Sequence, residues 1–201
     1  MLSEEEFVKF VNLPPLPGWY IKSARDLILA NDNSSPSAYV NDPIVNLAKP
    51  AETVEINNKI FHYGNFFRQK LGNIHHQWAA KHLPNIPDLN VVLVNKGDLW
   101  PHQDYQCAWS LIWVVDAGGD DVETYWSKPK DGLLRPEYQN LLYWRYYTGL
   151  EEIHSECIPV GKWAIIPVNV VHGTKNQTGD RIIITTKITQ QQYEEIIKDY
   201  S

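Results

Sequence analysis

Residues 158–188 read IPVGKWAIIPVNVVHGTKNQTGDRIIITTKI, and this stretch indicates the class of fold. Two apolar runs rich in β-branched residues, at 163–168 and 181–188, are typical of β-strands. A glycine-containing turn precedes each run. Both runs are shorter than an ordinary helix, so the stretch predicts neighbouring strands with a buried face.

The same pattern continues through the second half of the chain. Further candidate strands lie at 90–95, 109–115, 122–127 and 153–159, with turn residues between several of them. Several short strands at this spacing favour a sandwich or a barrel.

The two ends of the chain have a helical pattern. We predict helices at 3–11, after a capping box, and at 22–30, and a broken helix pair around Gly72 within 65–82. The final stretch, TQQQYEEIIKDY, has its apolar residues on one helical face. We therefore expect one domain over 1–201. It has a helical and irregular part at 1–89, a β core at 90–188 and a C-terminal helix at 189–201.

Composition restricts the class of protein. The chain is 43% hydrophobic and 21% charged, which is ordinary for a soluble globular protein. A net charge of −6 is a poor match for a phosphate backbone, so we expect no nucleic-acid partner. The chain has no run of about 18 apolar residues and no apolar segment near its start, so we expect no membrane span and no secretory signal. These features favour a cytoplasmic protein in which Cys107 and Cys157 are reduced thiols.

Residues with ligand chemistry stand at the ends of the predicted strands. In LWPHQDYQCAWSLIWVV (99–115), His102 and Asp104 are two positions apart and point to the same face of an extended chain. Such a pair alone favours a surface location for both side chains, so the interpretation depends on the rest of the sequence. His172, however, closes an apolar strand later in the chain. Two imidazoles and one carboxylate make a facial triad, a set that suits iron(II) and leaves coordination positions open.

Arg181 follows His172 by nine residues and opens the last predicted strand. A guanidinium at the inner end of an apolar strand must meet a carboxylate or remain unpaired at high cost. Because the intervening loop is short, we expect Arg181 and His172 at the same rim of the fold. Their separation suits a small dicarboxylic keto acid that chelates the metal at one end. The alternative is that Arg181 pairs with an internal Asp or Glu.

The ordered set His102-x-Asp104, His172 and Arg181 resembles the iron(II)- and 2-oxoglutarate-dependent oxygenases, with a spacing to the Arg similar to that of the prolyl-hydroxylase branch. The resemblance covers 90–188 and includes GGDDVETYWS, which is similar to the family's Gly-Gly-x-Thr-like strand. It implies a mainly β fold with flanking helices, a double-stranded β-helix (a cupin-like jelly roll).

The same resemblance implies a function for the site. His102, Asp104 and His172 would bind Fe(II) and form the catalytic centre, and Arg181 would bind the distal carboxylate of the co-substrate 2-oxoglutarate. The implied reaction uses O2 to hydroxylate a small molecule or a peptide residue, and it releases succinate and CO2.

Several residues keep two interpretations. Thr185 and Tyr105 are candidates for a second contact to the 2-oxoglutarate carboxylate, or they serve packing and surface roles. The aromatic segment at 138–156 forms either a substrate wall or a packing surface. His75 and His76 adjoin in a predicted helix, and we expect them at the surface or its boundary.

Two other functions remain open from the sequence alone. The first is a cupin-type metal-binding enzyme that does not use 2-oxoglutarate. The second is a non-catalytic jelly-roll binding protein in which the grouping of His102, Asp104 and His172 is a coincidence.

Overall fold

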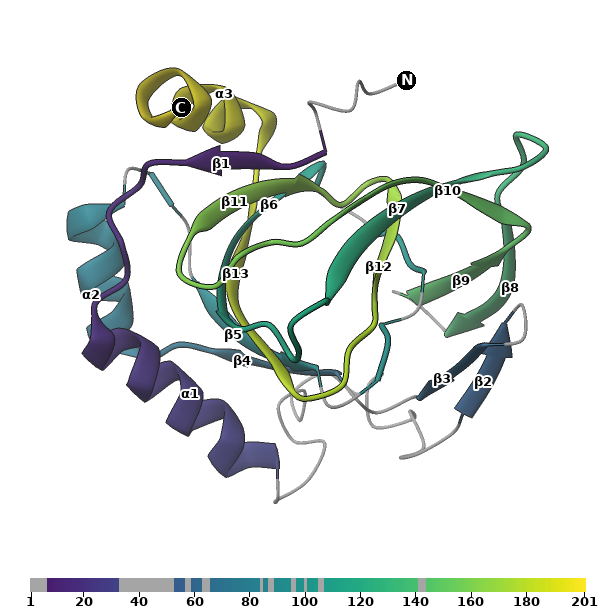
Figure 1. The fold of residues 1–201 in the computed structure, drawn as a ribbon. Helices are drawn as coiled ribbons and strands as arrows, with labels where there is room; N and C mark the ends of the chain where they lie inside the picture. The colour runs from purple at the N-terminus through teal and green to yellow at the C-terminus, as the bar shows by residue number, and fades with distance from the viewer. Residues whose placement is uncertain are drawn as a thin grey trace.

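A computed structural model describes most of the chain (Figure 1). The described residues are 7–32, 53–56, 59–62, 66–83, 85–86, 89–94, 97–99, 101–104, 107–140 and 144–201. Tyr105 lies outside these ranges.

Two antiparallel sheets form the body of the molecule. The larger one, here the major sheet, has the strand order β1-β11-β6-β13-β5-β4, and the minor sheet has the order β10-β7-β12. The strands of the major sheet are β1 (Lys9–Val11), β4 (Phe66–Lys70), β5 (Asn90–Val94), β6 (Trp109–Asp116), β11 (Trp163–Pro167) and β13 (Arg181–Ile188). Those of the minor sheet are β7 (Glu123–Pro129), β10 (Leu150–Glu156) and β12 (Val171–Lys175).

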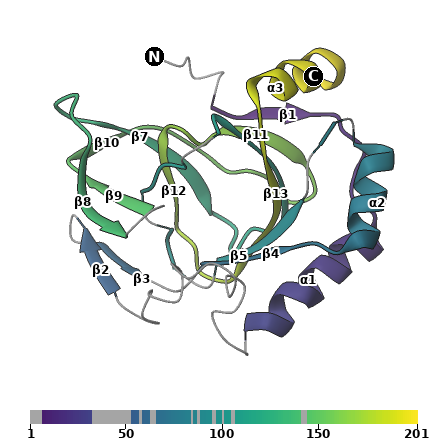
Figure 2. The ribbon, with the colours of Figure 1, turned by 180° about the vertical axis from the view of Figure 1, so that it is seen from behind.

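Three helices and two hairpins complete the described fold. The helices are α1 (Gly18–Asp32), α2 (Asn73–His82) and α3 (Gln190–Tyr200). The hairpins are formed by β2 (Thr53–Ile56) with β3 (Lys59–His62) and by β8 (Arg135–Asn140) with β9 (Trp144–Thr148). Both Figure 1 and the reverse view in Figure 2 place α1 and α2 at one side of the molecule and the hairpins at the opposite side.

The order in which the chain visits the two sheets defines the fold. It runs from β5 in the major sheet to a bridge between His102 and His172 beside the minor sheet, and then back to β6. From β7 and β10 in the minor sheet it returns to β11, crosses to β12, and ends in β13. This alternation is a double-stranded β-helix, so the predicted jelly roll is confirmed.

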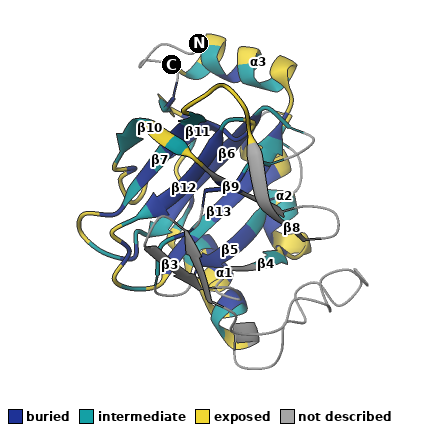
Figure 3. Ribbon diagram, turned by 90° about the vertical axis from the view of Figure 1, so that its right-hand side faces the viewer, coloured by how far each residue is buried: buried dark blue, intermediate teal, exposed yellow. Residues whose placement is uncertain are grey.

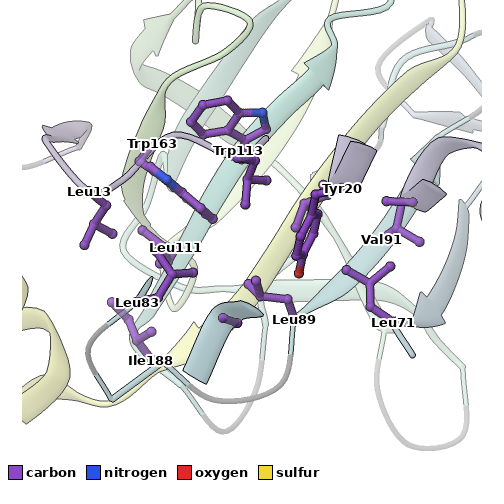
Figure 4. Close-up of a cluster of buried hydrophobic side chains, with 14 of the residues drawn as sticks. Leu13, Tyr20, Leu71, Leu83, Leu89, Val91, Leu111, Trp113, Trp163 and Ile188 are labelled. Carbon is purple, nitrogen blue, oxygen red and sulfur yellow. The ribbon is translucent and has the colours of Figure 1, made fainter. Parts of the chain in front are cut away.

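Both faces of the major sheet are covered, which explains the continuous apolar runs of its strands. On β13, Ile182, Ile184 and Ile188 pack in the cluster beneath α1 and α2, whereas Ile183 faces the interior between the two sheets. Figure 3 shows the buried strands in the middle of the molecule, and Figure 4 shows Trp113, Trp163 and Tyr20 in the helix-side cluster.

The N-terminal prediction was partly wrong. Instead of a helix over 3–11, Lys9–Val11 forms the edge strand β1 paired with β11. Instead of a broken helix pair over 65–82, the chain forms β4 and then α2. In both places pairing with an existing sheet overrides local helical preference. The helix predicted at 22–30 is present as part of α1.

The strand predictions at 90–95, 109–115, 122–127, 163–168 and 181–188 are confirmed within one or two residues, whereas the one at 153–159 lies three residues beyond β10 (Leu150–Glu156). His172 does not close the strand before it, because it is the second residue of the separate strand β12. The C-terminal helix is present as α3 and begins with a capping box between Thr189 and Gln192. Within the described residues, no helix has the length and apolarity needed to span a bilayer. Cys107 and Cys157 are both free thiols.

Candidate metal centre

Two chain segments carry the three predicted ligands, and backbone hydrogen bonds join these segments. The amides of His102 and His172 each donate to the other residue's carbonyl, both at 2.8 Å. The amide of Asp104 donates to the carbonyl of Val168 at 2.8 Å. The segment at 101–104 is therefore held against the start of β12, which brings residues seventy positions apart in the sequence into one site.

The structure brings His102, Asp104 and His172 together. One ligand atom from each lies within 4.8 Å of the other two. His102 is 3% exposed and His172 is 6% exposed, and their ring centres are 4.3 Å apart. Oδ1 of Asp104 lies 4.0 Å from Nε2 of His102. A single cation can contact two imidazole nitrogens and one carboxylate oxygen here.

The hydrogen bond made by Nδ1 of His172 leaves Nε2 of the same ring able to bind a metal. Its Nδ1 lies 2.9 Å from the carbonyl oxygen of Val170, which can only accept, so Nδ1 carries the proton. This tautomer leaves the Nε2 lone pair free to bind a metal. Burial lowers the pKa of His172 to about 4, against a smaller opposing effect of the Val170 carbonyl, so the ring is neutral at pH 7.

Trp126 forms a wall beside His172. It stands directly opposite His172 on the neighbouring strand β7 and is fully buried. Its indole Nε1 donates to the carbonyl of Pro167 at 3.0 Å, which fixes the ring. A fixed indole next to a ligand excludes water from that side of the centre.

Lys187 binds the carboxylate of Asp104, and the sequence analysis missed it. Its ammonium donates to Oδ2, while Oδ1 faces His102. The two carboxylate oxygens are thus divided between the triad and Lys187, an arrangement in which an outer partner orients a ligand. Burial lowers the pKa of Lys187 to about 7, and the nearby charge of Arg68 acts in the same direction. The alternation of β13 was the available signal, since Lys187 lies on the same strand face as Arg181.

Arg181 lies inside the sandwich but not at the rim where we expected it. From His172, β12 runs to the opposite end of the sandwich before the turn that leads into Arg181. Arg181 therefore begins β13, and Lys187, six residues later on the same strand face, stands near the metal-binding end. The side chain of Arg181 extends from the interior face that it shares with Ile183.

The Arg181 guanidinium is buried without a carboxylate partner among the described residues. It is 4% exposed, and its Nη1 donates to the carbonyl of Ala117 at 3.4 Å. Burial lowers its pKa to about 10, so it remains charged at pH 7. The alternative of an internal Asp or Glu partner is therefore not met in the described part of the chain. An unpaired buried cation is costly, and an anionic ligand would stabilise it.

The interior face of the major sheet is cationic. Arg68 of β4 lies opposite Val92, and Val92 lies opposite Ile183, so Arg68 faces the same space as Arg181 and Lys187. Such a space favours an anionic ligand.

Thr185 lies between Arg181 and Lys187 on the interior face of β13, where it is buried. Its hydroxyl lies 2.8 Å from the Ser110 hydroxyl and donates to the carbonyl of Leu111 at 3.1 Å. The Thr185 hydroxyl is thus already bonded to protein groups. Tyr105, the other candidate, lies outside the described residues.

Within the described residues, no further histidine belongs to this grouping. His75, expected at the surface or its boundary, is buried under α1, where its ring lies 4.5 Å from that of Tyr20. His76 is half-buried on the same helix.

The chemistry of the donor set fits a divalent transition metal. Two imidazoles and one carboxylate, with no thiolate in the group, are the ligands of non-haem iron(II) centres. Three protein ligands leave coordination positions for a second molecule.

No family model matches the chain, and no curated protein matches it in sequence. Several solved structures resemble it. One of them is the structure of E. coli ycfD. The match covers 96% of this chain and 53% of ycfD, at 12% identity and a TM-score of 0.45. The chain also resembles SnoN, a non-heme alpha-ketoglutarate-dependent epimerase from nogalamycin biosynthesis, at 10% identity and a TM-score of 0.43, over 90% of this chain and 77% of that one.

A third similar structure is an oxidoreductase of the 2OG-Fe(II) oxygenase family from Burkholderia pseudomallei, at 8% identity and a TM-score of 0.33, over 83% of this chain and 87% of that one. The chain spans less than two thirds of the length of three of the matched structures, at 53% of ycfD and at 64% and 30% of two others. The structures that this double-stranded β-helix resembles thus include iron- and 2-oxoglutarate-dependent oxygenases.

Proposed function

We propose that the protein is an iron(II)- and 2-oxoglutarate-dependent oxygenase that hydroxylates a small molecule or a peptide residue and releases succinate and CO2. One observation carries this proposal. A His-Asp-His ligand set and a buried guanidinium with no carboxylate partner among the described residues face the same interior, since His172 lies opposite Trp126 and Arg181 shares its strand face with Ile183. A metal ligand set alone fits many reactions, whereas the added cation calls for a ligand with a distal negative charge.

Each residue has a defined role in the proposal. His102, Asp104 and His172 hold Fe(II), which when bound supplies the activation of O2. Arg181 binds the distal carboxylate of 2-oxoglutarate, because a guanidinium binds a carboxylate through two parallel hydrogen bonds. Lys187 keeps Oδ1 of Asp104 directed at the metal by holding Oδ2.

Charge and burial support an anionic co-substrate over a neutral one. The described interior has three cations, Arg68, Arg181 and Lys187, and the carboxylate of Asp104 neutralises only one of them. Bound Fe(II) would add two further positive charges, so the site favours a dianion such as 2-oxoglutarate over a neutral co-substrate. The apolar surroundings of Ile183 and Trp126 keep water away, which strengthens each of these interactions.

The choice of substrate and compartment follows from weaker observations. The net charge of −6 supports a small molecule or a peptide over a nucleic acid as the substrate. We also propose a cytoplasmic location, because the composition is that of a globular protein and both cysteines are free thiols.

Thermal unfolding with redox-inert Mn(II) in place of iron tests the proposal. A ligand that binds only the folded state raises the unfolding temperature. We expect Mn(II) to raise it, and 2-oxoglutarate to raise it further only when Mn(II) is present. Arg181→Met should keep the first increase and lose most of the second. Arg25→Met, which removes an exposed guanidinium on α1, is the matched control and should behave as wild type.

The outcomes separate the candidate functions. An increase with Mn(II) but none with 2-oxoglutarate would favour the cupin-type enzyme over the oxygenase. No response to either ligand would favour the non-catalytic binding protein. Release of succinate from 2-oxoglutarate across a panel of amino acids, peptides and metabolites then identifies the substrate class.

A further inference from the structure

The β8–β9 hairpin lies on the minor-sheet side of the molecule, away from α1 and α2 (Figures 1 and 2). It pairs only within itself among the described strands, so its backbone pairing does not attach it to either main sheet. Tyr147 of β9 is nevertheless 1% exposed. Its position is therefore fixed by side-chain contacts.

Tyr147 reaches the metal-binding segment through Gln103. The Tyr147 hydroxyl donates to Oε1 of Gln103 at 3.0 Å. At the other end of the same amide, Nε2 of Gln103 donates to the carbonyl of Asn169. Both halves of the amide have partners, and a flip would turn Oε1 toward the Asn169 carbonyl, which cannot donate, so this orientation is the one that satisfies both.

Gln103 stands between the two ligand-bearing segments. In the sequence it separates His102 from Asp104, and its side chain points away from the side that they share. Asn169 likewise lies between Val168 and Val170, the carbonyls of which accept from the Asp104 amide and from Nδ1 of His172. One side chain therefore joins the backbones that position all three ligands.

We propose that Tyr147 and Gln103 are positioning residues that couple the β8–β9 hairpin to the metal centre. Metal binding orders the segments at 101–104 and 168–172, and the Gln103–Tyr147 hydrogen bond passes this order to the hairpin. The hairpin then forms a fixed wall of the substrate site. This inference rests on the metal-binding part of the proposed function and is independent of 2-oxoglutarate.

Coupling between two sites is reciprocal, so the hairpin must respond to the metal and the metal affinity must respond to the hairpin. A bond that merely holds Tyr147 in place would change the stability of the hairpin equally with and without metal. The informative quantity is therefore the metal-dependent change.

Amide hydrogen exchange of the full chain measures this change, with Mn(II) alone as the probe and calorimetry on the same samples to record metal binding. In wild type, Mn(II) should slow exchange in peptides that cover Arg135–Asn140 and Trp144–Thr148. In Tyr147→Phe, the factor by which Mn(II) slows this exchange should be about fivefold smaller, because that is the ratio expected for the loss of one neutral hydrogen bond. The affinity for Mn(II) should fall by a similar factor.

Two further variants complete the design. Tyr20→Phe makes the same chemical change at a buried phenol that has no hydrogen-bond partner among the described residues, so the hairpin response to Mn(II) should stay as in wild type. Gln103→Met removes both amide contacts at similar length and should reproduce Tyr147→Phe. It serves as the test if Tyr147→Phe does not fold.

The outcomes distinguish this inference from the proposed function. If wild type binds Mn(II) and the hairpin does not respond, or if Tyr147→Phe and Gln103→Met both respond as wild type does, the coupling is wrong and the oxygenase proposal stands. If calorimetry detects no binding of Mn(II) to wild type, the metal centre itself is wrong and both fail.

Discussion

Single side chains in the sandwich interior carry charges that the described protein groups do not fully balance. Arg181 and Lys187 lie six residues apart on one face of β13, and only Lys187 has a carboxylate partner among the described residues. This difference assigns them different roles. Lys187 forms an ion pair with Asp104 and so supports the ligand set, whereas Arg181 is available for a bound anion.

The prediction of these residues from the sequence was uneven. His102, Asp104 and His172 were predicted because ligand types stood at strand ends in a recognisable order. Lys187 was missed because the alternation of β13 places it on the interior face but does not bring it near Asp104, more than eighty residues earlier. That contact exists only because β13 ends beside the metal-binding segment, which is a property of the three-dimensional fold.

The buried imidazole of His75 makes stability depend on pH. Burial, followed by the charge of His76, lowers the pKa of His75 below 6.5, its ordinary value. The unfolded chain therefore takes up a proton at a higher pH than the folded chain does. The stabilising contribution is complete above about pH 6.5 and is lost as the pH falls below that value.

Denaturant unfolding between pH 7 and pH 5, with a chelator present, checks this. His75→Leu should show a smaller loss of unfolding free energy over that interval than wild type. His76→Gln, on the same helix but only half-buried, should keep most of the loss. Equal losses in wild type and His75→Leu would rule out His75 as the cause.

At the scale of elements, β12 requires a glycine directly after His172. A Cβ atom on Gly173 would lie 2.5 Å from the carbonyl oxygen of Leu99 and 2.8 Å from the Tyr125 hydroxyl. That carbonyl accepts from the Thr174 amide at 3.1 Å, so it cannot move without breaking the contact that holds 97–99 on β12.

We expect Gly173→Ala to lower the unfolding free energy by about 1–3 kcal/mol, the usual cost of overpacking, and to weaken metal binding. Chemical denaturation and calorimetry with Mn(II) measure the two effects. Gly18→Ala is the matched control, since a Cβ there meets nothing within 4 Å. A Gly173→Ala protein as stable as the control would show that the strand adjusts freely.

The C-terminal helix depends on Thr189, the residue that caps its N-terminus. The Thr189 hydroxyl accepts from the Gln192 amide at 3.2 Å, and the Gln192 side chain accepts from the Thr189 amide at 2.8 Å. Thr189→Ala should cost about 1 kcal/mol of stability by denaturant unfolding. Gln191→Ala, also in the first turn but outside the cap, should cost clearly less. A cost for Thr189→Ala no larger than that of Gln191→Ala would mean that packing of Ile196 alone holds α3.

The elements themselves were predictable where the apolar pattern was strong. The strands β5, β6, β11 and β13 are nearly continuous apolar runs, and pattern alone located them. The strand β1 carried a helical pattern locally, and its conformation is decided by its pairing with β11. The strand β12 was missed because Gly173, Thr174 and Lys175 do not continue the apolar run.

For the whole molecule, the fold explains why ligands from distant parts of the chain meet. Alternation between two sheets brings the 101–104 segment and β12 side by side, with β13 facing them across the interior. The sequence predicted the double-stranded β-helix but misplaced Arg181 at the metal rim. The two cations of β13 instead lie at different points along the strand. Lys187 is beside the ligand Asp104, and Arg181 is at the start of the strand in the sandwich interior.

The most direct test of the metal and co-substrate site is visible absorption without oxygen, as iron(II) and then 2-oxoglutarate are added to wild type, His172→Ala and Arg181→Met. Wild type should develop a weak visible charge-transfer band, because a keto acid chelates the iron. His172→Ala should develop none, and Arg181→Met should need a much higher 2-oxoglutarate concentration. Absence of the band in wild type, or the same titration in all three proteins, would contradict the assignment.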